Sequence, residues 1–178
     1  MAGNNPHQAL QNFLDPLRRV IACITKSQIV QTAGPDDCVP DKVYSLFVGS
    51  DEEIFFKVSS QPTVYAEISM DFVIIEVPKA DLLKLGRYKV STRWYRYNVL
   101  NHRRQEMLSY QWHPGTEVDF PHLHVSSLEK CHLPTGRISI EQFAWLLIDA
   151  FEVKPRKGCD WKSILKETEG KFKQYRTW

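Results

Sequence analysis

The segment HPGTEVDFPHLHV, residues 113–125, holds three of the chain's six histidines and has the clearest capacity for chemistry in the sequence. His122 and His124 are separated by one residue, so on a β-strand their side chains point to one face, about 6.5–7 Å apart along the chain. The residues before His113 alternate in the same way, with His113 on the polar face of its own strand. If the two strands adjoin, the three imidazoles converge.

Three converging imidazoles are compatible with three kinds of site. His113, His122 and His124 could bind Zn²⁺ or Fe²⁺. They could instead act as metal-free acid–base groups near neutral pH, or donate hydrogen bonds to loop carbonyls at a sheet edge beside Pro121. The spacing of the histidines is compatible with all three kinds of site. Beyond zinc or iron no cofactor is expected, since there is no glycine-rich nucleotide motif, and the adjacent pair Cys131-His132 is more typical of packing than of a zinc site.

A basic segment precedes the histidines. Residues 82–104 contain seven lysines and arginines and no acid, and GRYKVSTRWYRYN alternates these bases with aromatic residues. Arginine for phosphate and aromatic rings for base stacking is the composition of a single-stranded nucleic-acid platform. The same alternation is also typical of a strand whose aromatic residues face the core. Arg96 is grouped with His113, His122 and His124 as a catalytic candidate, and the predicted nucleic-acid-binding residues are Arg87, Lys89, Arg93, Trp94, Arg103, Arg104 and Arg137.

The elements that must position these residues follow from the periodicity. Residues 42–125 are rich in β-branched and aromatic residues and broken by short turns, which favours antiparallel strands. Residues 6–28 carry an apolar stripe after Asn5-Pro6, and Asp15-Pro16 repeats that start, so two short helices or one kinked helix is predicted. Ser139 and Gln142 fit a capping box at the start of two helices over residues 139–176, the second capped by Asp160.

One α+β domain over residues 1–178 is therefore predicted, with an antiparallel sheet of about five or six strands. The N-terminal helix and the two C-terminal helices are expected to pack on that sheet. Hydrophobic residues make up 43% of the chain and charged residues 25%, which are ordinary values for a globular protein. No apolar run approaches the roughly 18–20 residues of a membrane span, no secretory signal is apparent, and four widely spaced cysteines indicate a reducing compartment. We expect a soluble, cytoplasmic protein without membrane contact.

Three resemblances extend over parts of the chain. Gly115, His122, His124, Glu129 and Gly136 resemble the first cupin motif, but helices are predicted where the second cupin motif should follow, so a cupin is not expected. The PHLHV segment, HLPTGR and the terminal RTW resemble a family of small, uncharacterised bacterial proteins over residues 92–178. WYRYNV and the FPHLH ending are similar to TumE-type proteins of toxin–antitoxin modules over residues 92–125, although the two later helices depart from that pattern. These resemblances imply a bacterial protein linked to toxin–antitoxin or defence loci, with no reaction to inherit.

Three functions remain open from the sequence. The preferred hypothesis is a His/Arg polar site directed at nucleic acid, in which arginine holds phosphate and imidazoles supply acid and base. The alternatives are a non-catalytic, antitoxin-like or accessory subunit that binds a partner protein, and a metal-dependent enzyme built on the H-x-H pair. The sequence alone does not decide whether the protein is an enzyme, and it gives no indication of oligomeric state.

Overall fold

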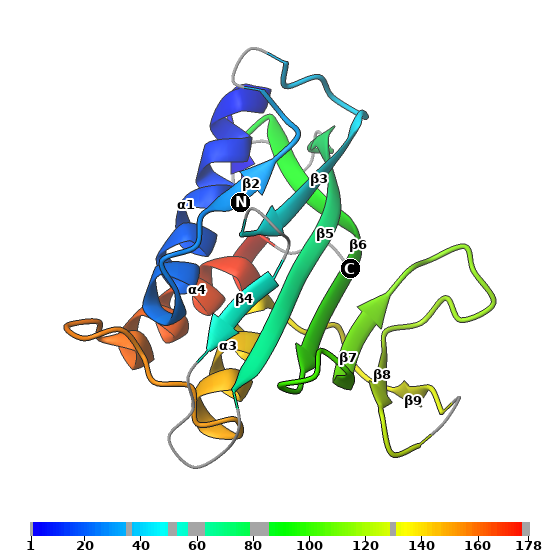
Figure 1. Cartoon of the computed structure of the whole chain (residues 1–178). Helices are drawn as coiled ribbons and strands as arrows, with labels where there is room; N and C mark the ends of the chain where they lie inside the picture. The colour runs from blue at the N-terminus through cyan, green and yellow to red at the C-terminus, as the bar shows by residue number, and fades with distance from the viewer. Residues whose placement is uncertain are drawn as a thin grey trace.

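The computed structural model describes residues 2–34, 37–49, 53–56, 63–78, 86–128 and 131–175. The predicted α+β class is confirmed (Figure 1). Residue 176 of the predicted last helix, and Glu129 and the RTW ending of the resemblances, lie outside the described residues. The elements in chain order are β1 (Ala2–Gly3), α1 (Pro6–Ile24), β2 (Ile29–Gln31), β3 (Val43–Val48), β4 (Glu53–Phe56), β5 (Val64–Glu76), β6 (Tyr88–Leu100), β7 (Glu106–Trp112), β8 (His122–Val125), β9 (Leu133–Pro134), α3 (Ile140–Asp149) and α4 (Trp161–Tyr175).

The strands form one antiparallel sheet in the order β2-β3-β5-β6-β7-β8-β9, with β4 paired to β5 and β1 paired to β6. Among the described residues the sheet has nine strands, against the five or six predicted. Six of them, β3 to β8, lie in the region where strands were predicted. The other three, β1, β2 and β9, have only two or three residues each, too few to produce an alternating pattern.

The described helices lie together on one side of the sheet, as predicted (Figure 1). Alternate residues of the central strands point toward them. Phe72 of β5 contacts Phe13 of α1, with ring centroids 5.6 Å apart, and Tyr97 of β6 contacts Phe143 of α3 at 5.4 Å. All four rings are buried in one apolar core. The other face of the sheet is left open by the described helices, and we call it the open face. None of the described helices has the length and apolar character that a membrane span requires.

The predicted helix starts are found, and one predicted end is wrong. The Asn5 side chain accepts a hydrogen bond from the Gln8 N–H at 2.8 Å and Pro6 occupies the first turn. The helix runs through Pro16 as one element but ends at Ile24 rather than residue 28, because Thr25 turns to an extended backbone that leads into β2. The capping box of Ser139 and Gln142 is confirmed, and Asp160 accepts from the N–H of Ser163.

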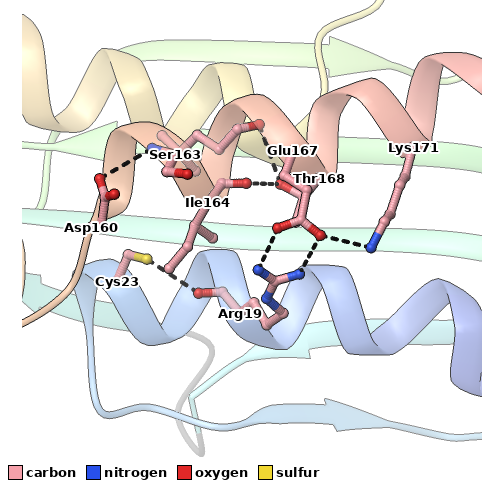
Figure 2. A network of polar contacts seen from close by, with 9 residues as sticks. Arg19, Cys23, Asp160, Ser163, Ile164, Glu167, Thr168 and Lys171 are labelled. Carbon is pink, nitrogen blue, oxygen red and sulfur yellow. Dashed lines mark hydrogen bonds and ion pairs between the residues drawn. The ribbon is translucent and has the colours of Figure 1, made fainter.

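An ion-pair network fastens α4 to α1 (Figure 2). The guanidinium of Arg19 donates two hydrogen bonds to the Glu167 carboxylate, at 2.9 and 2.7 Å, and Lys171 adds a third at 2.8 Å. These bonds lower the pKa of Glu167 from 4.5 to about 2.

The thiol of Cys23, also on α1, has the opposite shift. Burial and a hydrogen bond to Cys159 raise the pKa of Cys23 to about 12, so that its thiol stays protonated and poorly nucleophilic.

The Glu167 network predicts a pH dependence of stability. A carboxylate whose pKa is lower in the folded than in the unfolded state stabilises the fold above pH 4.5, and this contribution disappears as pH falls toward 2. Glu167→Gln should therefore melt at a lower temperature than the wild type above pH 4.5, and the difference should shrink as pH falls. Thermal melts from pH 2 to 7 measure it. Asp15→Asn, which removes a surface pair with Arg18 inside α1, is the control; an equal pH profile in both variants would contradict this role for Glu167.

A candidate metal centre on the open face

The strand register sorts polar side chains of the open face into two rows that end at the histidines. Neighbouring positions in adjacent antiparallel strands share a face, roughly 5 Å apart. The first row, from β5 to β8, is Glu67, Asn98, Ser109 and His124. The second row is Ser69, Arg96, Gln111 and His122. The residues between the rows, such as Tyr97, point to the helices. The two rows therefore lie on the opposite face, and the prediction that His122 and His124 share one face is confirmed.

His122 is held in one tautomer with a free lone pair. Its side chain is fully buried, and its Nδ1 lies 2.8 Å from the carbonyl oxygen of Phe120. A carbonyl can only accept, so Nδ1 carries the proton and Nε2 carries the lone pair. Nε2 is buried and has no hydrogen-bond partner. A backbone carbonyl behind the distal nitrogen of a histidine is the usual outer support of a metal ligand.

His124 and His132 complete a group of three around His122. The imidazoles of His122 and His124 have centroids 4.9 Å apart, and His132 lies 4.9 Å from His122 and 4.5 Å from His124. The Nε2 of His124 is also buried without a partner. One donor atom from each of the three residues lies within 4.8 Å of the others, the only such group of His, Cys, Asp or Glu found in the part of the chain that the structure describes.

The geometry and protonation of this group fit a metal ion. Nitrogens bound to one tetrahedral zinc are about 3.3 Å apart, so small rotations of the rings close the 4.8 Å group. Burial, the largest cause, and the neighbouring histidines lower the pKa of both His122 and His124 below 6.5. This direction favours the neutral form of both rings, which is the form that coordinates a metal. Among the described residues the group consists of three histidines without a fourth protein ligand, which is the donor set of a catalytic rather than a structural zinc site.

His113 lies beside the group but has both ring nitrogens engaged. Its ring is 5.0 Å from that of His122, so the predicted convergence occurs. Its Nδ1 contacts the Thr116 hydroxyl at 2.8 Å, and its Nε2 contacts the side-chain Oε1 of Gln111 at 3.1 Å. Of the three histidines predicted as ligands, His113 is thus the one with both ring nitrogens in contact with other side chains. The third histidine of the group is His132 instead.

The bond from His113 begins a chain that crosses three strands. The Gln111 side-chain amide donates to the Ser109 hydroxyl at 2.7 Å, Ser109 donates to the side-chain Oδ1 of Asn98, and the Asn98 Nδ2 donates to the Glu67 carboxylate at 2.5 Å. Every donor points toward the carboxylate, so each bond polarises the next. The chain fixes the orientation of Gln111 and His113 next to the histidine group.

Arg96 and Trp94 are two candidates from the basic segment that lie on this face. Arg96 lies between Ser69 and Gln111 in the second row, two strands from His122. Its Nε is buried without a partner, and its Nη2 is 3.9 Å from the Glu67 carboxylate, which is a long ion pair. Trp94, two residues earlier on β6, pairs with Asp71 and is half-buried.

The other predicted nucleic-acid-binding residues are spread over the molecule. Lys89 is 4% exposed, and Arg87 at the start of β6 is paired with Glu76 at 3.2 Å. Arg137 stacks on Trp112, 3.2 Å from the ring centroid, and its pKa is lowered by burial. The remaining three are exposed, one near a β-bulge of the β5–β6 pair and two in the β6–β7 turn: Arg93, Arg103 and Arg104. Of the described residues predicted to bind nucleic acid or to act in catalysis in the basic segment, Arg96 and Trp94 are therefore the two that adjoin the histidines on the open face.

His132 was not among the residues predicted for the site. Its position depends on β9, a two-residue strand that returns antiparallel to β8 and pairs Leu133 with Leu123. The pattern LPTGR indicated only a turn before the next helix. The proximity of His132 to an H-x-H strand, ten residues after His122, is the one feature that pointed to it.

Comparison of the chain with protein-family models, with curated proteins and with solved structures gives no match.

Proposed function

We propose that this protein is a metal-dependent hydrolase of single-stranded nucleic acid, with Zn²⁺ or Fe²⁺ bound by His122, His124 and His132. The observation that carries the proposal is the convergence of two buried, unpartnered histidine nitrogens on a third histidine. Burying an imidazole nitrogen without a partner is unfavourable, and a metal ion satisfies several such nitrogens at once. A metal in such a site supplies a hydroxide nucleophile at neutral pH and stabilises charge on a phosphoryl oxygen.

Nucleic acid is proposed as the substrate because of two residues that lie near the histidines. The Arg96 side chain is 43% exposed and makes only a long contact to Glu67, so the outer nitrogens of its guanidinium can bind a phosphate beside the histidines. Trp94 on the same strand face offers a ring for base stacking. Hydrolysis adds water across a P–O bond: the water oxygen ends on phosphorus, and the leaving sugar oxygen takes a proton. In this arrangement His113 is a positioning residue, since both of its nitrogens are bonded.

The test is a cleavage assay on a 5′-labelled single-stranded RNA and the matching DNA. We expect cleavage by the protein supplied with zinc or iron, loss of cleavage with a chelator, and recovery when the ion is returned. Binding of nucleic acid that is unaffected by metal and never followed by cleavage would favour the non-catalytic alternative. No binding at low salt and no cleavage would reject the proposal.

Arg96→Ala is expected to weaken binding of single-stranded RNA by roughly 10- to 150-fold, because charge-assisted hydrogen bonds to phosphate contribute roughly 1.5–3 kcal/mol. The slope of the logarithm of the binding constant against the logarithm of the salt concentration should also fall by about one, the value for one lost phosphate contact. Fluorescence anisotropy at two salt concentrations measures both effects. Arg18→Ala is the matched control, because Arg18 is an exposed arginine on α1, on the other side of the sheet. Equal losses in the two variants would contradict a phosphate contact at Arg96.

A further inference from the structure

A groove lies between α3 and α4, on the helical side of the sheet. Its volume is about 290 Å³. α3 contributes Glu141, Gln142 and Trp145 to its lining, and α4 contributes Leu165 and the side chains of Lys162, Lys166 and Glu169. Most of the lining is apolar, and the volume is close to the lower limit of typical small-molecule sites. None of these residues belongs to the histidine site.

Glu141 is the unusual member of the lining. Its side chain is 2% exposed, and neither carboxyl oxygen has a hydrogen-bond partner. Of the nearest hydroxyls, Thr168 donates to the Ile164 carbonyl at 2.8 Å, whereas the Ser139 oxygen accepts from the Gln142 N–H and its own proton is not used by that bond. Burial, the largest cause, raises the pKa of Glu141; its own N–H and the hydroxyls of Ser139 and Thr168, which lie near the carboxyl but form no hydrogen bond of good geometry with it, lower the pKa by less.

A buried carboxyl without partners is expensive for a protein of ordinary stability. Its place in the first turn of α3 explains a preference for an acid, because the helix dipole favours negative charge there. That preference does not explain burial, since an exposed glutamate at the same position would gain the same interaction. A ligand that donates hydrogen bonds to Glu141 does explain it.

The rest of the groove restricts the ligand's chemistry. Trp145, one turn after Glu141, is 44% exposed and meets Trp161 edge-on at 5.0 Å, so it presents an aromatic wall. Two of the rim charges have partners: Glu169 is bonded to Lys173 at 2.8 Å and to the Gln142 amide at 3.1 Å, and Lys162 lies over the Trp161 ring. Lys166 is exposed to solvent. The buried carboxyl of Glu141 is thus the acid of the lining without a hydrogen-bond partner, and most of the surface around it is apolar.

We propose that this groove binds a small amine with an aromatic or apolar body. The ammonium donates to the Glu141 carboxylate, and the body packs against Trp145 and Leu165. This site is separate from the proposed metal centre and does not depend on the reaction assigned to it.

The test uses three probes that share a body and differ in charge: 2-phenylethylamine, 2-phenylethanol and phenylacetate. Isothermal titration of the full chain should show binding of the amine, with the alcohol and the acid at least tenfold weaker. Glu141→Gln keeps the shape and should weaken amine binding at least tenfold. Glu169→Gln, which removes an acid at the rim, is the matched control and should change affinity less than threefold. Absence of amine binding, equal binding of all three probes, or equal effects of the two variants would overturn the proposal.

Melting temperatures show whether a variant loses amine binding because its site has changed or because it is less well folded. An unpartnered carboxyl destabilises the free protein, so Glu141→Gln should melt at the same or a higher temperature than the wild type. 2-Phenylethylamine should raise the melting temperature of the wild type and of Glu169→Gln but not of Glu141→Gln. A large fall in the melting temperature of Glu141→Gln would mean that the carboxylate serves the fold, and that result would overturn the proposal as well.

Discussion

Replacement of His124 by alanine is expected to reduce the metal content of the purified protein from about one ion per chain to below about a tenth. His124 supplies one of the three nitrogens within 4.8 Å of each other, and its Nε2 has no partner in the protein. Loss of an outer-shell group typically weakens metal binding 10–100-fold, and loss of a ligand should exceed that. Elemental analysis after dialysis, followed by zinc titration against a chromophoric chelator, measures the change.

Three further histidine variants separate the possible ligand sets. His132→Ala should behave like His124→Ala, whereas His113→Ala should keep its ion with affinity reduced by roughly 10–100-fold, the range for an outer-shell group. His102→Ala, in the exposed turn between β6 and β7, should have no effect. A metal-free wild type that does not take up zinc, or equal losses in the His102 and His124 variants, would exclude the centre.

Much of the fold could be predicted because its longer elements carry strong periodic patterns. The alternation of residues over β6 and β7 predicted which side chains share a face. From this alone, His113 and Arg96 were predicted to lie on the same face as the H-x-H pair, as they do. The capping box at Ser139 is local and was equally visible. In each case the information lies within about ten consecutive residues.

The parts that could not be predicted depend on short strands and tertiary contacts. His132 reaches the site because the two-residue strand β9 folds back on β8, and two residues have no period. Lys89 appeared to be a surface base, but it is buried where β1, Ala2–Gly3, pairs with β6. The direction of the hydrogen bonds from His113 to Glu67 depends on which side chains meet across three strands. Local sequence specifies neither the partner nor the direction.

Phe72→Ala is expected to destabilise the protein by about 3–5 kcal/mol, as is usual for removal of a buried aromatic ring. Phe72 has no exposed surface and joins three elements, since its ring lies 5.6 Å from that of Phe13 in α1 and 5.8 Å from that of Tyr44 in β3. For a chain of this length the loss corresponds to a fall in melting temperature of roughly 6–20 °C. Phe120→Ala, which truncates a ring that is 41% exposed, should cost less than about 1 kcal/mol and is the control.

The same variant tests whether the two faces of the sheet act independently. Phe72 points to the helices and the histidines point to the open face, so truncating its ring should leave the metal affinity unchanged. A metal held at about 100 times its Kd stabilises the fold by about 2.7 kcal/mol whatever the stability of the core. A chelator should therefore lower the melting temperature of the wild type and of Phe72→Ala by similar amounts, and should not affect His124→Ala. If Phe72→Ala also lost the response to the chelator, the metal centre would depend on core packing through the sheet, and the independence of the two faces would be wrong.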